Sequence, residues 1–218
     1  SDASTDLQRV ARRHRQMCIS GRAAACQKVS TEGLDKLFSD VLSQQDESRR
    51  SLPPVHLWNP QLSGDMDLII DRDGRWIHEG GEIKRAPLVK LFASILKYED
   101  GQHFLVSPVE KWRITVNVAP FFITSVDLNT RSGEQAITCI TSTGDNVVIS
   151  KDHPLTVNLN EDSNEPIPLV MIRDQLAGLL SRNAYYQLVE WAETQHTDGV
   201  EQLFISSMGE QFLLGDSA

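Results

Sequence analysis

Cysteine is scarce in this sequence, and the spacings that mark a disulfide framework or a zinc site are missing. The three cysteines, Cys18, Cys26 and Cys139, follow no regular pattern, and no Cys-x-x-Cys pair is present. Small secreted folds and zinc sites depend on such spacings. We therefore expect no metal ion and no cofactor, and a reducing cytoplasm is the compartment that the cysteine content favours.

Long apolar segments and the familiar nucleotide and hydrolase motifs are also absent. No stretch reaches the roughly 20 apolar residues that a membrane-spanning helix needs, so we expect no membrane association. The P-loop pattern, HExxH, the GxSxG elbow and GxGxxG after a strand do not occur. These absences argue against a nucleotide hydrolase, a zinc protease and an α/β-hydrolase, and they favour a protein that is not an enzyme.

Positive charge is scarce outside the N-terminus. The chain holds 21 Lys and Arg against 30 Asp and Glu, a formal net charge of −9. Residues 1–28 contain six of the cations and only two acids, so residues 29–218 carry −13. Such an acidic chain repels phosphate backbones, which argues against general nucleic-acid binding. The basic segment has no periodic apolar pattern, and we expect it to be a disordered tail.

The first periodic apolar pattern follows this tail. Ser30 or Thr31 is suited to cap a helix, and apolar residues then recur at helical spacing on one face. This stripe consists of Leu34, Leu37, Phe38, Val41 and Leu42. Pro53-Pro54 then favours an extended chain through His56 and Trp58.

Residues 65–73 alternate with a period of two, which is typical of a half-buried strand. One face is apolar and the other acidic, with Met66, Leu68 and Ile70 against Asp65, Asp67, Asp71 and Asp73. Asp73-Gly74 tolerates the positive φ angles of a two-residue hairpin turn. With these two residues as the loop, Ile70 lies opposite Ile77 and Asp71 lies opposite Trp76. The acidic face is therefore expected to carry Trp76 and His78.

A helix and two strands are predicted after the hairpin. Pro87 suits the first turn of a helix, and the apolar residues that follow at helical spacing are expected to cover the apolar face of the hairpin. Strands are predicted over residues 103–106 and 109–118. In the second of these, Lys111 and Arg113 project from one face while apolar residues occupy the other.

The C-terminal half is predicted to be rich in strands. Turns at Ser132-Gly133 and Gly144-Asp145 separate the first three of them. The predicted strands are residues 121–129, 135–143, 146–151, 156–160, 169–172, 203–206 and 211–214. Leu176–Trp191 carries apolar residues at helical spacing, and we interpret it as one long or broken helix.

The segment that begins at Arg85 recurs in weaker form at Arg182. Both copies combine a helical apolar pattern with an Asp-Gly turn and a short strand. We interpret the recurrence as an internal duplication. The predicted fold class is α+β, with two similar lobes whose antiparallel sheets are each covered by a helix.

This interpretation divides the chain into three parts. Residues 1–28 form the disordered basic tail, residues 29–112 an N-terminal α+β lobe, and residues 113–218 a C-terminal β-rich lobe that contains the long helix. Two similar lobes in contact would enclose a cleft between them.

Several short motifs occur in order from about Val29 to the C-terminus. They comprise Pro53-Pro54-Val55, Trp58-Asn59-Pro60, Gly64-Asp65-Met66-Asp67, Asp73-Gly74-Arg75-Trp76, Leu91-Phe92-Ala93, Phe104-Leu105-Val106-Ser107-Pro108, Ala119-Pro120-Phe121 and Asp152-His153-Pro154-Leu155. Together they resemble the bacterial domain-of-unknown-function family 1285. The resemblance implies a duplicated α+β core with a second half similar to a pleckstrin homology fold. It also implies a nucleotide-like ligand at the interface of the halves and a role in signal transduction.

Three cations are candidates for an anion site in a chain that is otherwise acidic. The net charge of residues 29–218 repels an anion unless cations gather where it binds. An aromatic ring nearby is expected to stack on the base of a nucleotide-like ligand. The predicted ligand contacts are Lys111, Arg113, His153, Trp58, Trp76 and His56. The leading hypothesis is a cytoplasmic ligand-binding or regulatory module with its site between the lobes.

Two alternatives remain open. The carboxylates Asp65, Asp67 and Asp71, with His78 nearby, would suit a hard cation. A metal-assisted hydrolase would use Asp65, Asp67 and His56 or His78, with a bound metal that activates water. Same-face neighbours on a strand lie ~7 Å apart, too far to chelate one ion unaided, so a solvated hairpin face is favoured over this site. The second alternative is a protein-interaction adaptor without a small ligand.

Overall fold

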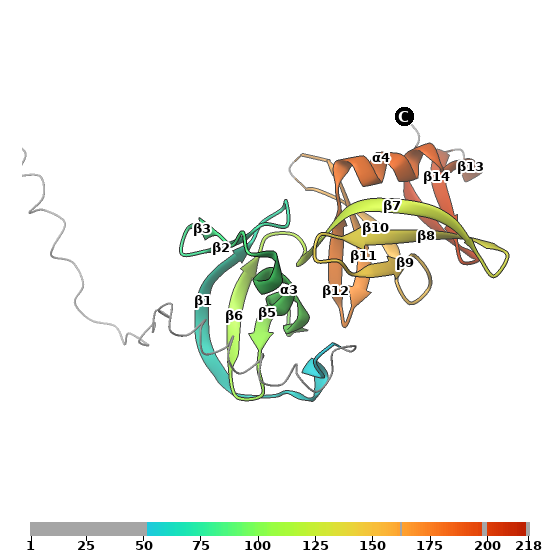
Figure 1. The fold of residues 1–218 in the computed structure, drawn as a ribbon. Helices are drawn as coiled ribbons and strands as arrows, with labels where there is room; N and C mark the ends of the chain where they lie inside the picture. The colour runs from blue at the N-terminus through green and yellow to red at the C-terminus, as the bar shows by residue number, and fades with distance from the viewer. Residues whose placement is uncertain (1–51, 162, 198–199, 217–218) are drawn as a thin grey trace, which may run out of the picture.

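The computed structural model describes residues 52–161, 163–197 and 200–216. The predicted basic tail and the helix predicted over Leu34–Leu42 lie outside these residues. The described chain forms two sheet-dominated lobes, each with one α-helix (Figure 1). Neither of these helices is long and apolar enough to cross a membrane.

The first lobe is a six-stranded sheet made of two antiparallel three-stranded units. Its elements are the 3-10 helix η1 (Val55–Leu57), β1 (Leu62–Ile70), β2 (Trp76–His78), β3 (Gly81–Glu82), α3 (Ala86–Ser94), β4 (Leu96–Glu99), β5 (Gln102–Val106) and β6 (Lys111–Val116). The strand order is β3-β2-β1-β6-β5-β4. The two units meet at the centre, where β1 and β6 run parallel. The sheet is therefore mixed, and the prediction of a fully antiparallel sheet is wrong.

Helix α3 packs on one face of this sheet, as the sequence predicts. Pro87 lies in its first turn, and Leu91, Phe92 and Ala93 are buried. The facing side chains of β1, none more than 4% exposed, are Met66, Leu68 and Ile70. Burying each large apolar side chain contributes about 1.5–3 kcal/mol, so this packing is a principal source of the lobe's stability.

The hairpin between β1 and β2 is shifted by one residue from the predicted register. Ile70 pairs with Trp76 instead of Ile77, because the loop spans Asp71–Arg75 and is longer than a two-residue turn. A shift of one residue exchanges the two faces of a strand. Trp76 therefore lies in the core, 2% exposed, with its ring centroid 6.2 Å from that of Phe92. The prediction that it shares the acidic face is wrong.

The second lobe repeats this design and adds a third sheet. Its elements are β7 (Phe121–Arg131), β8 (Glu134–Thr141), β9 (Asn146–Val148), β10 (Leu155–Leu159), β11 (Pro166–Arg173), β12 (Leu176–Leu180), α4 (Arg182–Glu190), β13 (Glu193–Thr197), β14 (Val200–Ser207) and β15 (Glu210–Asp216). The six-stranded sheet has the order β10-β11-β12-β7-β8-β9, with β12 and β7 parallel at its centre. The strands β13-β14-β15 form the third sheet, which contacts β8 and β10.

The long helix predicted over Leu176–Trp191 is instead a strand followed by a shorter helix. The apolar run of β12 pairs with β11 on one side and β7 on the other. Gly178 within this run packs closely against Ile123, because a Cβ there would lie 3.1 Å from that side chain, which would have to shift slightly. Ser181 then ends the strand and caps α4 by accepting a hydrogen bond from the amide of Ala184.

Each lobe contains a nine-residue helix followed by an antiparallel three-stranded unit, α3 with β4–β6 and α4 with β13–β15. Leu91 and Leu188, the residues matched by the proposed duplication, are 5% and 0% exposed. Strand β6 continues to Val116, so the predicted division between residues 112 and 113 falls inside a strand of the first lobe.

The two lobes share one continuous hydrophobic core and touch through specific side chains. Arg173 on β11 donates a hydrogen bond to the carbonyl of Ala93 at the end of α3. Its Nη1 also lies 3.7 Å from a carboxylate oxygen of Asp145. Burial lowers the pKa of the Arg173 guanidinium. A basic side chain of the second lobe thus holds the helix of the first.

Candidate functional site

Lys111 and Arg113 project from the outer face of β6, opposite the buried residues of that strand, as predicted. Each has a carboxylate partner. Lys111 Nζ pairs with Glu99, and Arg113 Nη1 lies 3.2 Å from Asp65 Oδ1. The hydrogen bond from Lys111 lowers the pKa of the Glu99 carboxyl. Both cations therefore serve as partners of acids within the first sheet.

His153 lies in the second lobe, between β9 and β10. Its Nδ1 donates to the carbonyl of Met171, 3.0 Å away, which orients the ring. The ring lines a hollow of about 330 Å³ together with Arg131 and residues of β9. Lys111 and Arg113 lie on β6 of the first lobe, and neither is among the residues that line this hollow with His153.

The predicted aromatic contacts are also separated. The Trp76 ring is enclosed in the core and is not available to stack on a ligand. Trp58 is half-buried against Val55, and its carbonyl accepts a hydrogen bond from Lys97 Nζ at 3.1 Å. His56 is exposed on η1. Trp58 is thus a packing residue of the first lobe.

The acidic residues of the hairpin stabilise its turn and strands. Asp71 accepts hydrogen bonds from the amides of Asp73 and Arg75, and its carboxylate lies 2.7 Å from Arg75 Nε. His78 Nδ1 donates to the carbonyl of Asp67 at 2.8 Å. Within the described ranges no group of three His, Cys, Asp or Glu side chains is placed to hold a metal ion. No observation therefore favours the metal-assisted hydrolase.

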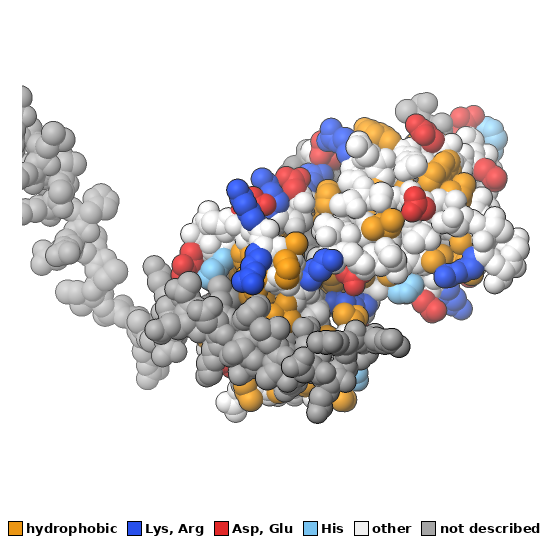
Figure 2. Space-filling view, in the orientation of Figure 1, with side chains coloured by type: hydrophobic (Ala, Val, Ile, Leu, Met, Phe, Trp, Pro, Cys, Tyr) orange, Lys and Arg blue, Asp and Glu red, His pale blue; other side chains and the backbone are white. Residues whose placement is uncertain are grey.

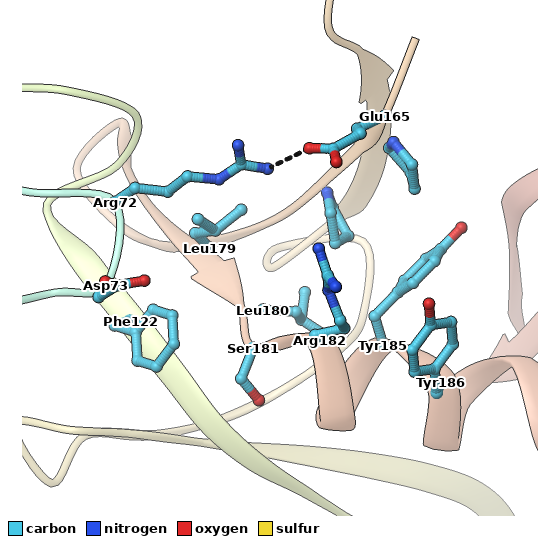
Figure 3. A pocket seen from close by; sticks show the side chains of 12 residues that line it. Arg72, Asp73, Phe122, Glu165, Leu179, Leu180, Ser181, Arg182, Tyr185 and Tyr186 are labelled. Atoms are coloured by element: carbon cyan, nitrogen blue, oxygen red, sulfur yellow. Dashed lines mark hydrogen bonds and ion pairs between the residues drawn. The ribbon is translucent and has the colours of Figure 1, made fainter. Parts of the chain in front are cut away.

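A larger hollow, of about 520 Å³, lies where the two lobes meet, and Figure 3 shows it from close by. The first lobe contributes two residues of the β1–β2 turn, and the second contributes β7, β11, β12, the loop before β11 and the start of α4. The lining consists of Arg72, Asp73, Phe122, Glu165, Pro166, Pro168, Leu179, Leu180, Ser181, Arg182, Tyr185 and Tyr186. None of the six predicted ligand contacts is among these residues.

The β1–β2 turn is held in place by a glycine against an aromatic ring. Gly74 has a φ of 75°, in the left-handed region that favours glycine. A Cβ added to it would lie 2.4 Å from the Cβ of Phe122 on β7. The close approach seats the turn on the second lobe, and with the bonds of Asp71 it fixes the backbone from which Arg72 reaches the hollow.

Helix α4 presents its first two turns to the hollow. The hydroxyl of Tyr185 donates to the carbonyl of Leu214 at 2.9 Å, and burial raises the pKa of this hydroxyl. The neighbouring ring of Tyr186 lies 6.3 Å away between centroids and is 57% exposed. Tyr185 is thus fixed as part of the wall, while Tyr186 is accessible to solvent.

The basic and acidic side chains that line the hollow balance in number, but not every one of them forms an ion pair. Arg72 Nη2 lies 3.4 Å from Glu165 Oε2, and Asp73 is paired with Arg75 at 3.2 Å. Arg182 forms no ion pair or hydrogen bond through its side chain with any described residue. Basic and acidic side chains gather along the junction of the lobes in Figure 2. The arrangement offers guanidinium groups from both lobes, beside aromatic rings, to a ligand that carries negative charge.

Sequence reasoning missed this hollow because its residues are distant in sequence and ordinary in type. No sequence pattern singles out Arg72, and Arg182 is named only as the start of the second copy of the repeat. The available signal was the duplication itself, since two lobes in contact predict a cleft whose walls come from both.

Two family models match the chain and together cover most of the described residues. The first, described as "Domain of unknown function (DUF1285), N-terminal domain", matches residues 53–119. The second, described as "Protein of unknown function (DUF1285), C-terminal domain", matches residues 120–214. The molecule is thus a two-lobed, sheet-dominated protein with a hollow at the lobe junction. The chain belongs to the DUF1285 family, and the resemblance derived from its motifs is confirmed.

A solved structure agrees with this assignment. A DUF1285 family protein from Silicibacter pomeroyi DSS-3 is 35% identical, with a TM-score of 0.73 over 83% of this chain and 94% of that chain. A DUF1285 family protein from Shewanella baltica OS155 is 29% identical, with a TM-score of 0.46 over 57% of this chain and 91% of that chain. No curated protein matches the chain. The family descriptions state no activity or ligand.

Proposed function

We propose that this protein is a regulatory ligand-binding module, and that it binds a small anionic, nucleotide-like ligand in the hollow between its lobes. The observation that carries the proposal is the pair of guanidinium groups, Arg72 and Arg182, that line the hollow from opposite lobes. Asp73 and Glu165 balance the charge of the lining, but Arg182 has no carboxylate partner among the described residues, so an anionic group can pair with it.

The chemistry of arginine supports an oxyanion as the ligand group. A planar guanidinium matches the geometry of phosphate and carboxylate and can donate two parallel hydrogen bonds to either. The start of α4 supports the same charge, because Ser181 and Arg182 line the hollow and the positive end of a helix favours an anion. An anionic group is therefore expected near Arg182.

The size and the aromatic lining support a planar group in the same ligand. A volume of about 520 Å³ lies within the ~300–1,000 Å³ that is usual for small-molecule sites. Phe122 and the exposed ring of Tyr186 offer apolar faces on which a base can stack. The two requirements together describe a nucleotide better than a simple inorganic anion.

This proposal keeps the inter-lobe location implied by the family resemblance and changes the residues. Lys111, Arg113 and His153 do not line the hollow, so Arg72 and Arg182, which do, take the role first given to them. A likeness of the second half to a pleckstrin homology fold and a role in signal transduction belong to the same proposal. The cytoplasmic location inferred from the cysteine content fits a regulator of this kind.

Calorimetric titration with AMP, adenosine and inorganic phosphate tests the proposal. We expect AMP to bind more tightly than either half, since it uses both the cations and the rings. Arg182→Gln is expected to weaken AMP binding about 10- to 100-fold, the loss expected for a charged hydrogen bond. Arg85→Gln, which removes the same charge just before α3, is the matched control and is expected to leave the affinity unchanged.

Two outcomes would contradict this function. One is the absence of binding by AMP and phosphate at millimolar concentration, together with an unchanged melting temperature. The other is AMP binding that Arg182→Gln and Arg85→Gln affect equally, which would move the ligand away from the hollow.

A further inference from the structure

We propose that Glu165 is a built-in competitor of the ligand: it holds Arg72 while the hollow is empty, and the ligand must displace it to bind. This inference rests on the proposed function and adds a residue that lowers the affinity of the site for its ligand. Its basis is that one guanidinium of the hollow is paired with a carboxylate of the same hollow, across the junction of the lobes.

The geometry of this ion pair makes it easy to displace. Arg72 Nη2 and Glu165 Oε2 are 3.4 Å apart, long for a charged hydrogen bond, and the two side chains are 49% and 47% exposed. A pair in contact with water loses most of its attraction to screening and to the entropy of ordering two long side chains. Arg72 can therefore exchange Glu165 for a ligand oxyanion at small cost.

The anchoring on both sides determines which group moves. The turn that carries Arg72 is fixed by Asp71 and by Gly74 on Phe122, so only the side chain of Arg72 is free to turn. The backbone of Glu165 is held as well, because its carbonyl accepts from the amide of Asn160 at 2.9 Å. The exchange is thus a change of partner by a side chain and requires no movement of the lobes.

The other acid of the hollow does not compete in this way. Asp73 is paired with Arg75 at 3.2 Å, and Arg75 does not line the hollow. Glu165 is therefore the lining carboxylate whose partner is itself a proposed ligand contact. Removing its charge therefore frees Arg72 for the ligand.

A double-mutant cycle measured by calorimetry with AMP tests the inference. Glu165→Gln is expected to tighten AMP binding about two- to fivefold, the range that an exposed ion pair allows. In an Arg72→Gln background the same substitution is expected to change the affinity by less than about 1.5-fold, because no pair remains to be broken. Glu161→Gln removes the same charge from the same loop, outside the hollow, and is expected to have no effect.

The outcomes separate this inference from the function on which it rests. If AMP binds and Arg182→Gln weakens it, but Glu165→Gln leaves the affinity unchanged or lowers it, the function stands and Glu165 is not a competitor. An equal gain from Glu165→Gln and Glu161→Gln would also overturn the inference, since it would reflect general charge. Absence of AMP binding in both the wild type and Glu165→Gln overturns the function and the inference together.

Discussion

The helix and the three-stranded unit that follows it occur once in each lobe, and the two copies are used differently. In the first lobe, β4–β6 join β1–β3 in a single sheet, and α3 packs over that sheet with Phe92 in the core. In the second lobe, β13–β15 form a sheet of their own, and α4 borders the hollow with its first turns. The same local unit thus serves as core in one lobe and as the wall of a candidate site in the other.

The ends of the two helices show the same difference. Helix α3 begins after Arg85 without a side-chain cap and relies on Pro87, whose missing amide needs no partner in the first turn. Helix α4 begins with a capping serine, Ser181, whose hydroxyl also donates to the carbonyl of Thr124 on β7. The serine thus fixes the backbone of the helix start that faces the hollow.

The largest expected effect in this comparison of the two helices concerns the leucine that each of them buries. Leu188→Ala and Leu91→Ala are each expected to lower the free energy of unfolding by ~2–5 kcal/mol, through lost burial and a residual cavity. Urea denaturation measures both changes. Leu213→Ala, on an exposed side chain of β15, is the control and is expected to stay within about 0.5 kcal/mol. A neutral Leu188→Ala would break the correspondence between the two helices.

The next test concerns the seat of the first lobe on the second. Gly74→Ala is expected to cost about 2–4 kcal/mol, because the residue has a positive φ and a Cβ would overlap Phe122. Gly101→Ala shares the positive φ, 77°, but its Cβ meets nothing within 4 Å, so about 1 kcal/mol is expected. Thermal unfolding of both variants gives the difference. Equal losses would mean that the turn does not depend on its contact with β7.

A smaller effect is expected at the helix starts. Ser181→Ala removes the cap of α4 and is expected to cost about 1 kcal/mol. Arg85→Ala at the corresponding position of α3 removes a side chain that caps nothing, and a change within about 0.5 kcal/mol is expected. Denaturant midpoints of the two variants measure the contrast. A larger loss of stability in Arg85→Ala than in Ser181→Ala would contradict the assignment of the cap to Ser181.

The smallest effect concerns the ion pair on the outer face of the first sheet. Lys111 lowers the pKa of Glu99 from the ordinary 4.5, so this carboxyl stabilises the fold at neutral pH. The contribution is lost as the pH falls below 4.5 through the lowered folded-state pKa. Glu99→Gln is expected to cost less than about 1 kcal/mol at pH 7, since the pair is partly exposed. Denaturation at pH 7 and pH 3 tests this, and a difference that persists at pH 3 would assign the loss to packing.

The sequence predicted the local elements well where turn residues and periodicity agree. Strands β7, β8 and β9 and the turns between them lie where Gly133 and Gly144 indicate, and α3 has Pro87 in its first turn. The register of the hairpin differs by one residue from the prediction because Asp71 accepts hydrogen bonds from the amides of Asp73 and Arg75. The loop is therefore longer than the two residues Asp73-Gly74. The alternation of apolar and polar residues does not reveal that Asp71 forms these hydrogen bonds.

The long helix and the site required information that is not local. The run Leu176–Leu180 fits a buried helix or a buried strand equally well by periodicity, and pairing with β7 decides between them. Arg72 from the first lobe and Arg182 from the second line the same hollow, and their positions along the chain do not predict this. The duplication and the family resemblance were the two signals that pointed to the interface of the lobes.

The single parallel pair at the centre of each six-stranded sheet has a consequence for the order of folding. Every other strand pair in the described sheets joins neighbours in the chain through a short turn, and such contacts form early because little chain entropy opposes them. Pairing β1 with β6, or β12 with β7, closes a long segment that contains whole units. The three-stranded units are therefore expected to form first, and each six-stranded sheet becomes continuous only when its central parallel pair forms.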